Sequence, residues 1–198
     1  MAGAVVGGDG LARCPWGNGP EEMRRYHDEE WGRPVHGDRL VFERLSLEGF
    51  QSGLSWLTIL RKRDAFRAAF ADFDIETVAS YADRDVERLL GDAGIVRHRG
   101  KIEAVIANAR VLRQWQAQEG DGVLDGRVWT CEVSEPTPSR PATLADVPTT
   151  SPAAIDLARD LKRRGWRFLG PTTAYAALQA IGVVDDHVRG CIVAERTR

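Results

Sequence analysis

Apolar residues recur three or four positions apart along most of the chain. The spacing is clearest over residues 39–70 and again over residues 101–115, where Ile102, Val105 and Ala109 fall on one stripe. This is the period of an amphipathic helix with one face packed on a core. No stretch alternates apolar and polar residues between turn signals, so few strands are expected. The pattern predicts an all-α fold.

Two further helices carry their own start and stop signals. The segment 151–165 begins with a serine cap followed by proline at the first helical position, and it ends on Gly165. The segment 172–182 is shorter and closes on Gly182. These two segments predict a pair of helices joined by a short turn.

The turn between these helices has a possible chemical use. Phe168, Leu169, Gly170 and Pro171 cannot continue a helix, and Thr172 or its neighbour Thr173 is placed to cap the next one. A tight turn that opens into a helix N-terminus presents free backbone N–H groups, which bind phosphate without reading base sequence. The alternative is an ordinary helix–helix corner, which is the commoner use of such a turn.

Composition limits the classes of protein to consider. The 198 residues are 43% hydrophobic, enough for one domain with a sizeable core. No apolar run approaches the about 20 residues that span a bilayer. The Gly-rich start, residues 1–10, predicts a flexible tail rather than a signal peptide. Three cysteines without a secretion signal favour the reducing cytoplasm over a disulfide framework.

The net charge of −2 does not by itself indicate a nucleic-acid partner. Basic residues are nevertheless clustered at 61–63, 97–101 and 162–167, and a locally basic face can meet phosphates. For any one cluster, a solvated helix end is the simpler interpretation.

Four residues near the two ends of the chain form a candidate metal site. His187 and Cys191 lie four positions apart, which on a helix directs both side chains to one face. Cys14 and His27 form a second pair near the start, and together the four suit tetrahedral zinc. Four protein ligands would leave no position for water, so such a zinc would be structural and would tie the chain ends together. The alternative is two buried cysteines and two ordinary histidines.

Five segments carry a family resemblance. They are YHDEEWG, LEGFQSGLSWLTIL, DAGIVRHRGKIEAVIANA, FLGPTTAYAALQAIG and DDHVRGC, which follow one another in this order within residues 13–191. Together they resemble the DNA-3-methyladenine glycosylase I family. The resemblance implies an all-α, helix-hairpin-helix DNA glycosylase fold and one structural zinc on Cys14, His27, His187 and Cys191. It also implies a monomer that excises N3-methyladenine from double-stranded DNA by hydrolysing the N-glycosidic bond.

The resemblance assigns residues to the flipped base. It sets Trp16, Tyr26 and Trp56 around the base, whereas Trp31 is better explained by core packing. Glu48 is the residue expected to recognise the cationic base, with Gln51 three positions on, on the same helical face. A buried, unpaired carboxylate in this apolar segment would be costly without such a role.

The resemblance also has departures and limits. Met23 stands where an aromatic residue is expected near the site. Asp185 lies near the position of an acid that related glycosylases use on harder substrates, but the sequence favours a helix cap for it. The hairpin, with its DNA contacts expected over Phe168–Thr172, has no lysine in its turn, so strand cleavage is not expected.

Two organisational expectations remain. Residues 11–198 are expected to form one glycosylase domain, with a zinc-linked lobe from 11–40 and 183–198 and a helical body from 41–182. The functional rival is a non-catalytic, zinc-stabilised helix-hairpin-helix DNA-binding module, which would have no use for a buried Glu48.

Overall fold

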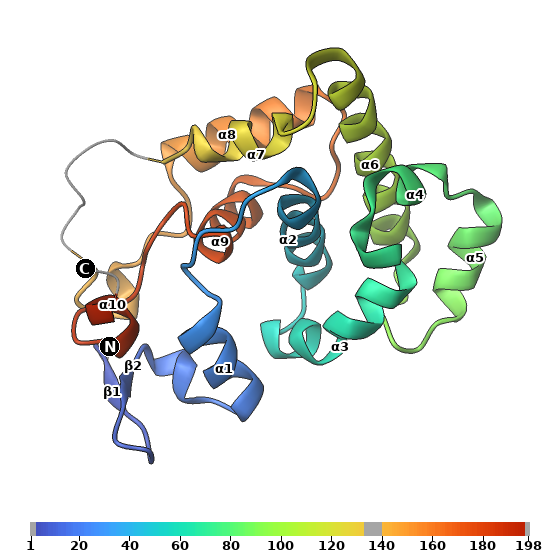
Figure 1. The fold of residues 1–198 in the computed structure, drawn as a ribbon. Coiled ribbons are helices and arrows are strands. Elements are labelled where there is room, and N and C mark those ends of the chain that lie inside the picture. The colour runs from blue at the N-terminus through green and yellow to red at the C-terminus, as the bar shows by residue number, and fades with distance from the viewer. Residues whose placement is uncertain (1–2, 133–139, 197–198) are drawn as a thin grey trace.

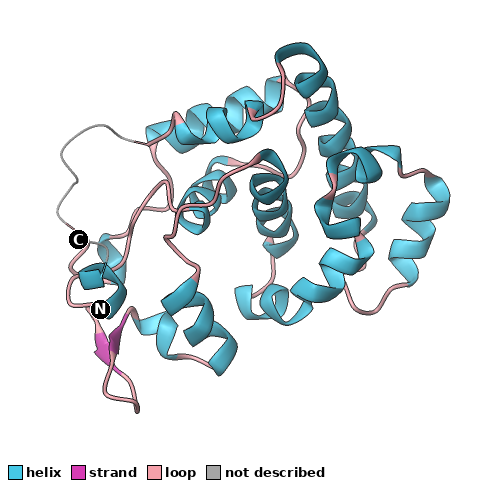
Figure 2. Ribbon diagram, viewed as in Figure 1, coloured by secondary structure: helices cyan, strands magenta, loops and turns pink. Residues whose placement is uncertain are grey.

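The fold is a set of helices arranged around one central helix (Figures 1 and 2). The computed structural model describes residues 3–132 and 140–196. Its helices are α1 (Glu21–Glu29), α2 (Asp38–Gln51), α3 (Trp56–Ala69), α4 (Ile75–Ser80), α5 (Asp83–Gly91), α6 (Arg99–Glu119), α7 (Val123–Trp129), α8 (Pro152–Arg163), α9 (Pro171–Ile181) and α10 (Ile192–Arg196). Short 3-10 turns occur at Pro15–Asn18, Ala71–Phe73 and Leu144–Asp146. The expected predominance of helix is confirmed.

One short antiparallel ribbon stands beside the helices. Strand β1 (Val5–Val6) pairs with β2 (Ala12–Arg13), with Val5 opposite Arg13. The ribbon begins inside the segment expected to be a flexible tail, residues 1–10. Its turn is joined to β2 because Asp9 accepts a hydrogen bond of 2.9 Å from Arg13.

Helix α2 is the centre of the main core. Apolar side chains are buried all round it, at Val41, Phe42, Leu45, Leu47 and Phe50, because α3, α6, α7 and α9 all pack against it. A helix that is apolar on every side is one enclosed by neighbours. A charged residue on the buried faces of α2 therefore sits in a low-dielectric environment and needs a partner or a use.

The segment 39–70 folds as two helices rather than one. After Gln51 the chain turns at Gly53, whose φ of 81° lies in the left-handed region that glycine adopts without strain. Ser55 then caps α3, accepting a hydrogen bond of 3.2 Å from the Thr58 N–H. The turn leaves Leu54 exposed to 42%.

The predicted pair of helices at the C-terminal side is confirmed. Ser151 caps α8 by accepting a 3.1 Å bond from the Ala154 N–H, and α8 packs against α9. Helix α9 is not capped by Thr172 or Thr173: Gly170 is its cap residue and Pro171 its first helical residue. Proline at this position has no N–H to leave unpaired.

The two ends of the chain meet on one side of the molecule (Figure 1). The ribbon lies against α10, and a second small apolar cluster forms there from Cys14, Val188, Cys191, Val193 and Ala194. No helix in the described part of the chain combines the length and apolarity needed to cross a membrane.

Candidate functional site

Glu48 is an isolated carboxylate on the buried helix α2. It is 6% exposed, and burial raises its pKa to about 8 in spite of the opposing field of Arg44. Three other carboxylates in the described residues are as buried, and each accepts bonds within the protein: Asp38, Glu43 and Asp186. No described residue donates a hydrogen bond to Glu48. Its carboxyl group is therefore free to bind a ligand.

A group of aromatic rings approaches this carboxylate through Tyr26. Tyr26 of α1 is buried, and its ring centroid is 5.3 Å from that of Trp56, the first residue of α3. Trp16 lies 6.3 Å from Tyr26 on the other side. Burial, and secondarily the charge of Glu48, raises the pKa of the Tyr26 hydroxyl. The indole N–H of Trp56 is buried without a partner. We call Glu48, Tyr26, Trp16 and Trp56 the Glu48 cluster.

A group of ion pairs links the three helices around this cluster. Glu30, just after α1, accepts bonds of 2.6 and 2.9 Å from Arg63 of α3 and one of 3.3 Å from Arg44 of α2. Arg44 lies one helical turn before Glu48, and its Nη1 atom is buried with no hydrogen-bond partner. Sequence reasoning missed this network, although the four-residue spacing of Arg44 and Glu48 signals a shared helix face.

The other residues singled out from the sequence occupy separate positions. Gln51 is the last residue of α2 and half-buried, one turn after Glu48. Met23 packs beside Gly19. Trp31 packs edge-on against His187 at 4.6 Å and Trp16 at 5.0 Å, so it lies between the Glu48 cluster and the chain ends.

The candidate metal ligands converge where the chain ends meet. The ligand atoms of Cys14, His27 and Cys191 lie within 4.8 Å of one another, and all three residues are buried. A hydrogen bond from Cys14, together with one from His27, lowers the pKa of the Cys191 thiol. Thiolate is the form that binds metal. These three residues fit a metal ion.

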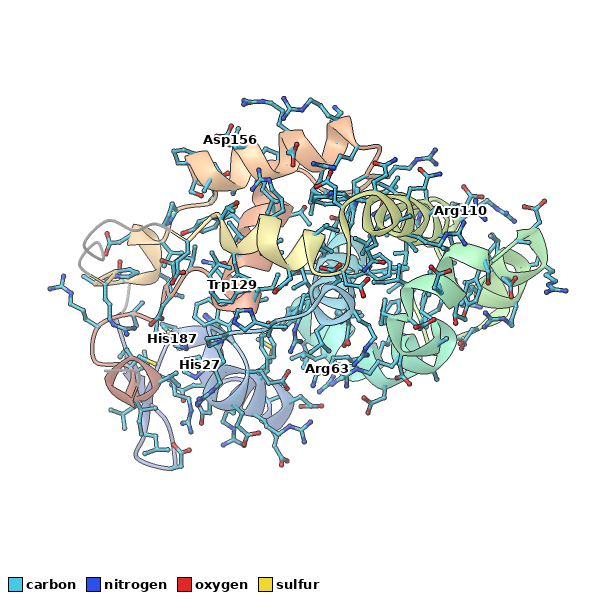
Figure 3. The ribbon with its side chains drawn as sticks, turned by 45° about the horizontal axis from the view of Figure 1, so that its top comes forward. His27, Arg63, Arg110, Trp129, Asp156 and His187 are labelled. Carbon is cyan, nitrogen blue, oxygen red and sulfur yellow. The ribbon has the colours of Figure 1, made fainter. Side chains whose placement is uncertain are left out.

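His187 adjoins this group as a fourth nitrogen. Its ring centroid is 5.0 Å from that of His27, and the two histidines lie side by side in Figure 3. Its Nε2 atom is buried and has no hydrogen-bond partner within the described part of the chain. An unpaired buried nitrogen beside two thiols and an imidazole is suited to be the fourth ligand of the same ion.

Both histidines are oriented by carboxylates. Nδ1 of His27 is 2.7 Å from Asp28, and Nδ1 of His187 is 2.8 Å from Asp185. Arg13 pairs with Asp28 at 2.7 Å, and Arg140 pairs with Asp185 at 2.7 Å. Such carboxylate contacts fix the orientation of an imidazole ring and leave its Nε2 as the atom that can bind a metal.

Two expectations about this segment are wrong. Residues 185–191 are not helical, so the four-residue spacing of His187 and Cys191 does not reflect a helix face. Asp185 caps no helix. Its carboxylate accepts a hydrogen bond of 3.1 Å from the His187 backbone N–H and also contacts the His187 imidazole, as described above. A turn rather than a helix therefore directs His187 inward.

The hairpin between α8 and α9 presents its backbone to solvent. Phe168 has a φ of 55° and is 46% exposed. Gly170, Pro171 and Thr172 are exposed, while Leu169 is half-buried. An open groove of about 510 Å³ runs along the hairpin, lined on its basic side by Lys162 and Arg167. The N-terminus of α9 opens here, so the hairpin offers N–H donors to an anion.

Comparisons with known proteins decide the family. The model of the methyladenine glycosylase family matches residues 16–194. The chain belongs to this family. It is 45% identical to DNA-3-methyladenine glycosylase 1 of Escherichia coli (strain K12), over 91% of this chain and 96% of the relative.

Solved structures of the family have the same fold. A crystal structure of 3-methyladenine DNA glycosylase I matches with a TM-score of 0.85 at 44% identity, covering 91% of this chain and 98% of the other. A variant of 3-methyladenine DNA glycosylase I, solved in complex with 3-methyladenine, matches with a TM-score of 0.84 at 34% identity, covering 91% and 96%.

Proposed function

We propose that the chain is a DNA glycosylase that excises N3-methyladenine from alkylated double-stranded DNA. The observation that carries this proposal is Glu48, a buried carboxylate with no hydrogen-bond partner among the described residues. It lies near Tyr26, whose ring packs beside that of Trp56. A helix-hairpin-helix DNA-binding module without catalysis gives no use for it, because an unpaired buried carboxylate costs stability.

The reaction needs little chemical assistance from the protein. Methylation at N3 makes the base cationic, so it is already a good leaving group. The glycosidic bond breaks with its electron pair going to the base, which leaves neutral, and water adds to the sugar cation with loss of a proton. The protein has to extract the base from the duplex, bind it and exclude other bases.

The Glu48 cluster supplies the recognition. The rings of Tyr26, Trp56 and Trp16 give the flipped base stacking faces, while Glu48 and Gln51 accept and donate hydrogen bonds at its polar edge. With a pKa of about 8, Glu48 is largely protonated at pH 7 in the free protein. A cation beside it favours the carboxylate, so arrival of the base is coupled to loss of a proton.

Two exposed segments engage the duplex. The hairpin residues Phe168–Thr172 bind a backbone phosphate through N–H groups and so fix the register of the DNA. Leu54 projects from the turn after α2, one turn beyond Gln51, and an apolar side chain there fills the space that the flipped base leaves in the stack.

One zinc ion on Cys14, His27, His187 and Cys191 joins the two ends of the chain. Support comes from the three ligand atoms within 4.8 Å and from the unpaired Nε2 of His187. Four protein ligands leave no position for water. This zinc is structural, and its binding free energy is folding free energy.

The proposal is tested by incubating the purified protein with duplex DNA treated with a methylating agent and measuring released purines. We expect free N3-methyladenine and unbroken strands, since the hairpin turn has no lysine to form a Schiff base. Duplex binding without any base release would favour the non-catalytic module. Strand nicking at the abasic site would contradict the monofunctional assignment.

A further inference from the structure

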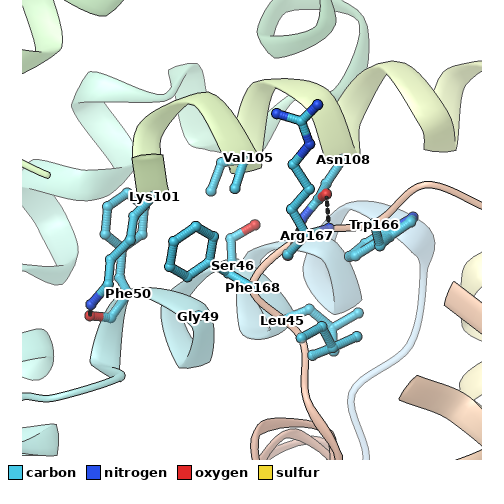
Figure 4. Close-up of a pocket in the computed structure, with 12 residues that line it drawn as sticks. Leu45, Ser46, Gly49, Phe50, Lys101, Val105, Asn108, Trp166, Arg167 and Phe168 are labelled. Carbon is cyan, nitrogen blue, oxygen red and sulfur yellow. Dashed lines mark hydrogen bonds between the residues drawn. The ribbon is translucent and has the colours of Figure 1, made fainter. Parts of the chain in front are cut away.

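Helix α6 carries two buried polar side chains, one that contacts the end of α2 and one that contacts the hairpin between α8 and α9. Lys101 is 7% exposed and Asn108 is 5% exposed. They lie seven positions apart, two helical turns or about 10 Å along one face. Both line a small pocket between α2, α6 and the hairpin, which Figure 4 shows.

Lys101 holds the end of α2. Its Nζ atom donates hydrogen bonds to the carbonyl oxygens of Phe50 at 3.0 Å and Ser52 at 2.6 Å. These two residues flank Gln51. Carbonyls at a helix C-terminus have no partner within the helix, and a cation there is favoured by the helix dipole. Lys101 therefore fixes the backbone of Gln51 and the start of the turn that presents Leu54.

Asn108 holds the entry to the hairpin. Its amide donates to the Arg167 carbonyl at 3.1 Å and accepts from the Arg167 N–H at 2.9 Å. The next residue, Phe168, has a φ of 55°, a left-handed conformation that is unfavourable for a residue other than glycine. The two-point contact of Asn108 supports this strained turn.

The two held segments touch each other. A Cβ atom on Gly49 of α2 would lie 3.4 Å from the Phe168 carbonyl oxygen, so the hairpin packs directly against α2. Gly49 adjoins Glu48 in the sequence. The distance between the Glu48 cluster and the hairpin is therefore set by α2, α6 and the two buried side chains.

We propose that Lys101 and Asn108 are positioning residues for base excision, Lys101 for the base-recognition end of α2 and Asn108 for the DNA-binding hairpin. The inference rests on the proposed function. Together they fix the distance between the hairpin and α2. A nucleotide whose phosphate is bound by the hairpin then places its base at Glu48 and Gln51.

The test compares Lys101→Met and Asn108→Leu with a control on the same helix, Arg110→Met. Arg110 is more exposed than Lys101 and Asn108 but also donates to backbone carbonyls, those of Ala79 and Tyr81; these lie in and after α4. Three quantities are measured for each variant: affinity for free 3-methyladenine, affinity for undamaged duplex DNA, and the single-turnover rate of release from methylated DNA. Melting temperatures report stability separately.

Lys101→Met should weaken free-base binding and slow release about tenfold or more while duplex affinity stays within about twofold. Asn108→Leu should weaken duplex affinity and slow release by similar factors while free-base affinity is unchanged. Lys101→Arg should restore most of the free-base affinity. Arg110→Met should lower the melting temperature and leave all three functional quantities unchanged.

Equal effects of the three substitutions, or effects on melting temperature alone, would overturn the assignment. If Asn108→Leu fails to fold, Asn108→Asp decides, since it keeps the acceptor for the Arg167 N–H and loses the donor. A normal duplex affinity and release rate in that variant would also overturn the role of Asn108. Absence of release by the unsubstituted protein would instead reject the proposed function.

Discussion

Glu48→Gln separates the functional value of this carboxylate from its cost to the fold. Glutamine keeps the shape and one acceptor but carries no charge. The pKa of Glu48 rises from the ordinary 4.5 to about 8 on burial, which corresponds to about 5 kcal/mol at about 1.36 kcal/mol per pKa unit. Because the folded state holds the proton more tightly than the unfolded state, stability falls as pH rises from 4.5 to about 8 and is constant above that.

The substituted protein lacks this pH dependence. The free energy of unfolding of Glu48→Gln should therefore exceed that of the unsubstituted protein by an amount that grows from pH 5 to pH 8.5, up to a few kcal/mol. Its single-turnover release of N3-methyladenine should fall about 10- to 100-fold, the effect of losing a charged hydrogen bond worth about 1.5–3 kcal/mol. Urea denaturation at pH 5.5, 7 and 8.5, with release rates at pH 7, measures both quantities.

Glu43→Gln is the matched control. Glu43 is equally buried on α2, but it is paired with Arg67 at 2.8 Å, so its substitution should lower stability and leave release unchanged. A stability difference for Glu48→Gln that does not vary with pH would refute the burial argument. Normal release by Glu48→Gln would show that another group recognises the base.

Three further outcomes are expected. Cys191→Ser should lower zinc content and melting temperature together, whereas Cys131→Ser, outside the ligand group, should keep its zinc. Atomic absorption measures the zinc content and thermal unfolding the melting temperature. An unchanged melting temperature in the zinc-free protein would exclude a structural ion. Insertion of one glycine after Gly170 should weaken duplex affinity and flatten its salt dependence while the circular dichroism spectrum is unchanged; full affinity would remove the hairpin from the interface. Asp38→Ala should lower the free energy of unfolding, measured by chemical denaturation, by about 2–4 kcal/mol without slowing release. The reason is that the carboxylate accepts four hydrogen bonds, three of them from backbone N–H groups around the start of α7. A cost under about 1 kcal/mol would show that water replaces the carboxylate as acceptor.

Local signals account for the parts of the fold that could be predicted. Ser151, Pro152 and Gly165 mark the ends of α8 through bonds made within a few residues, so the sequence alone contains the information. The break at Gly53 was not predicted because a single glycine within an apolar run is also tolerated inside helices. Residues 185–191 have a helical spacing without a helix, since local turn bonds, those of Asp185 to His187 and of the Cys191 N–H to the Val188 carbonyl, determine the path of the backbone.

The site was predictable where the residue itself carries the chemistry. Glu48 in an apolar segment and the cysteine and histidine pairs could be selected by type. Their supporting residues could not, because the partners are remote in the chain: Glu30 and Arg63 are 33 positions apart, and Lys101 reaches a carbonyl 51 positions away. Only the packing of α1, α2, α3 and α6 brings them together.

The environments of the carboxylates explain why such an enzyme acts on a cationic base. Asp186 accepts bonds from Tyr175 at 2.7 Å and Gln179 at 2.6 Å, and Asp185 is occupied by His187 and Arg140. Neither can approach a developing sugar cation without breaking these contacts. Glu48 alone among the buried carboxylates of the described residues is unpaired, and in the proposed function it meets the base, not the sugar. In the proposed function, a site that stabilises the leaving base but not the sugar releases only bases whose glycosidic bond is already weakened by charge, so we expect selectivity for cationic bases to follow from these carboxylate environments.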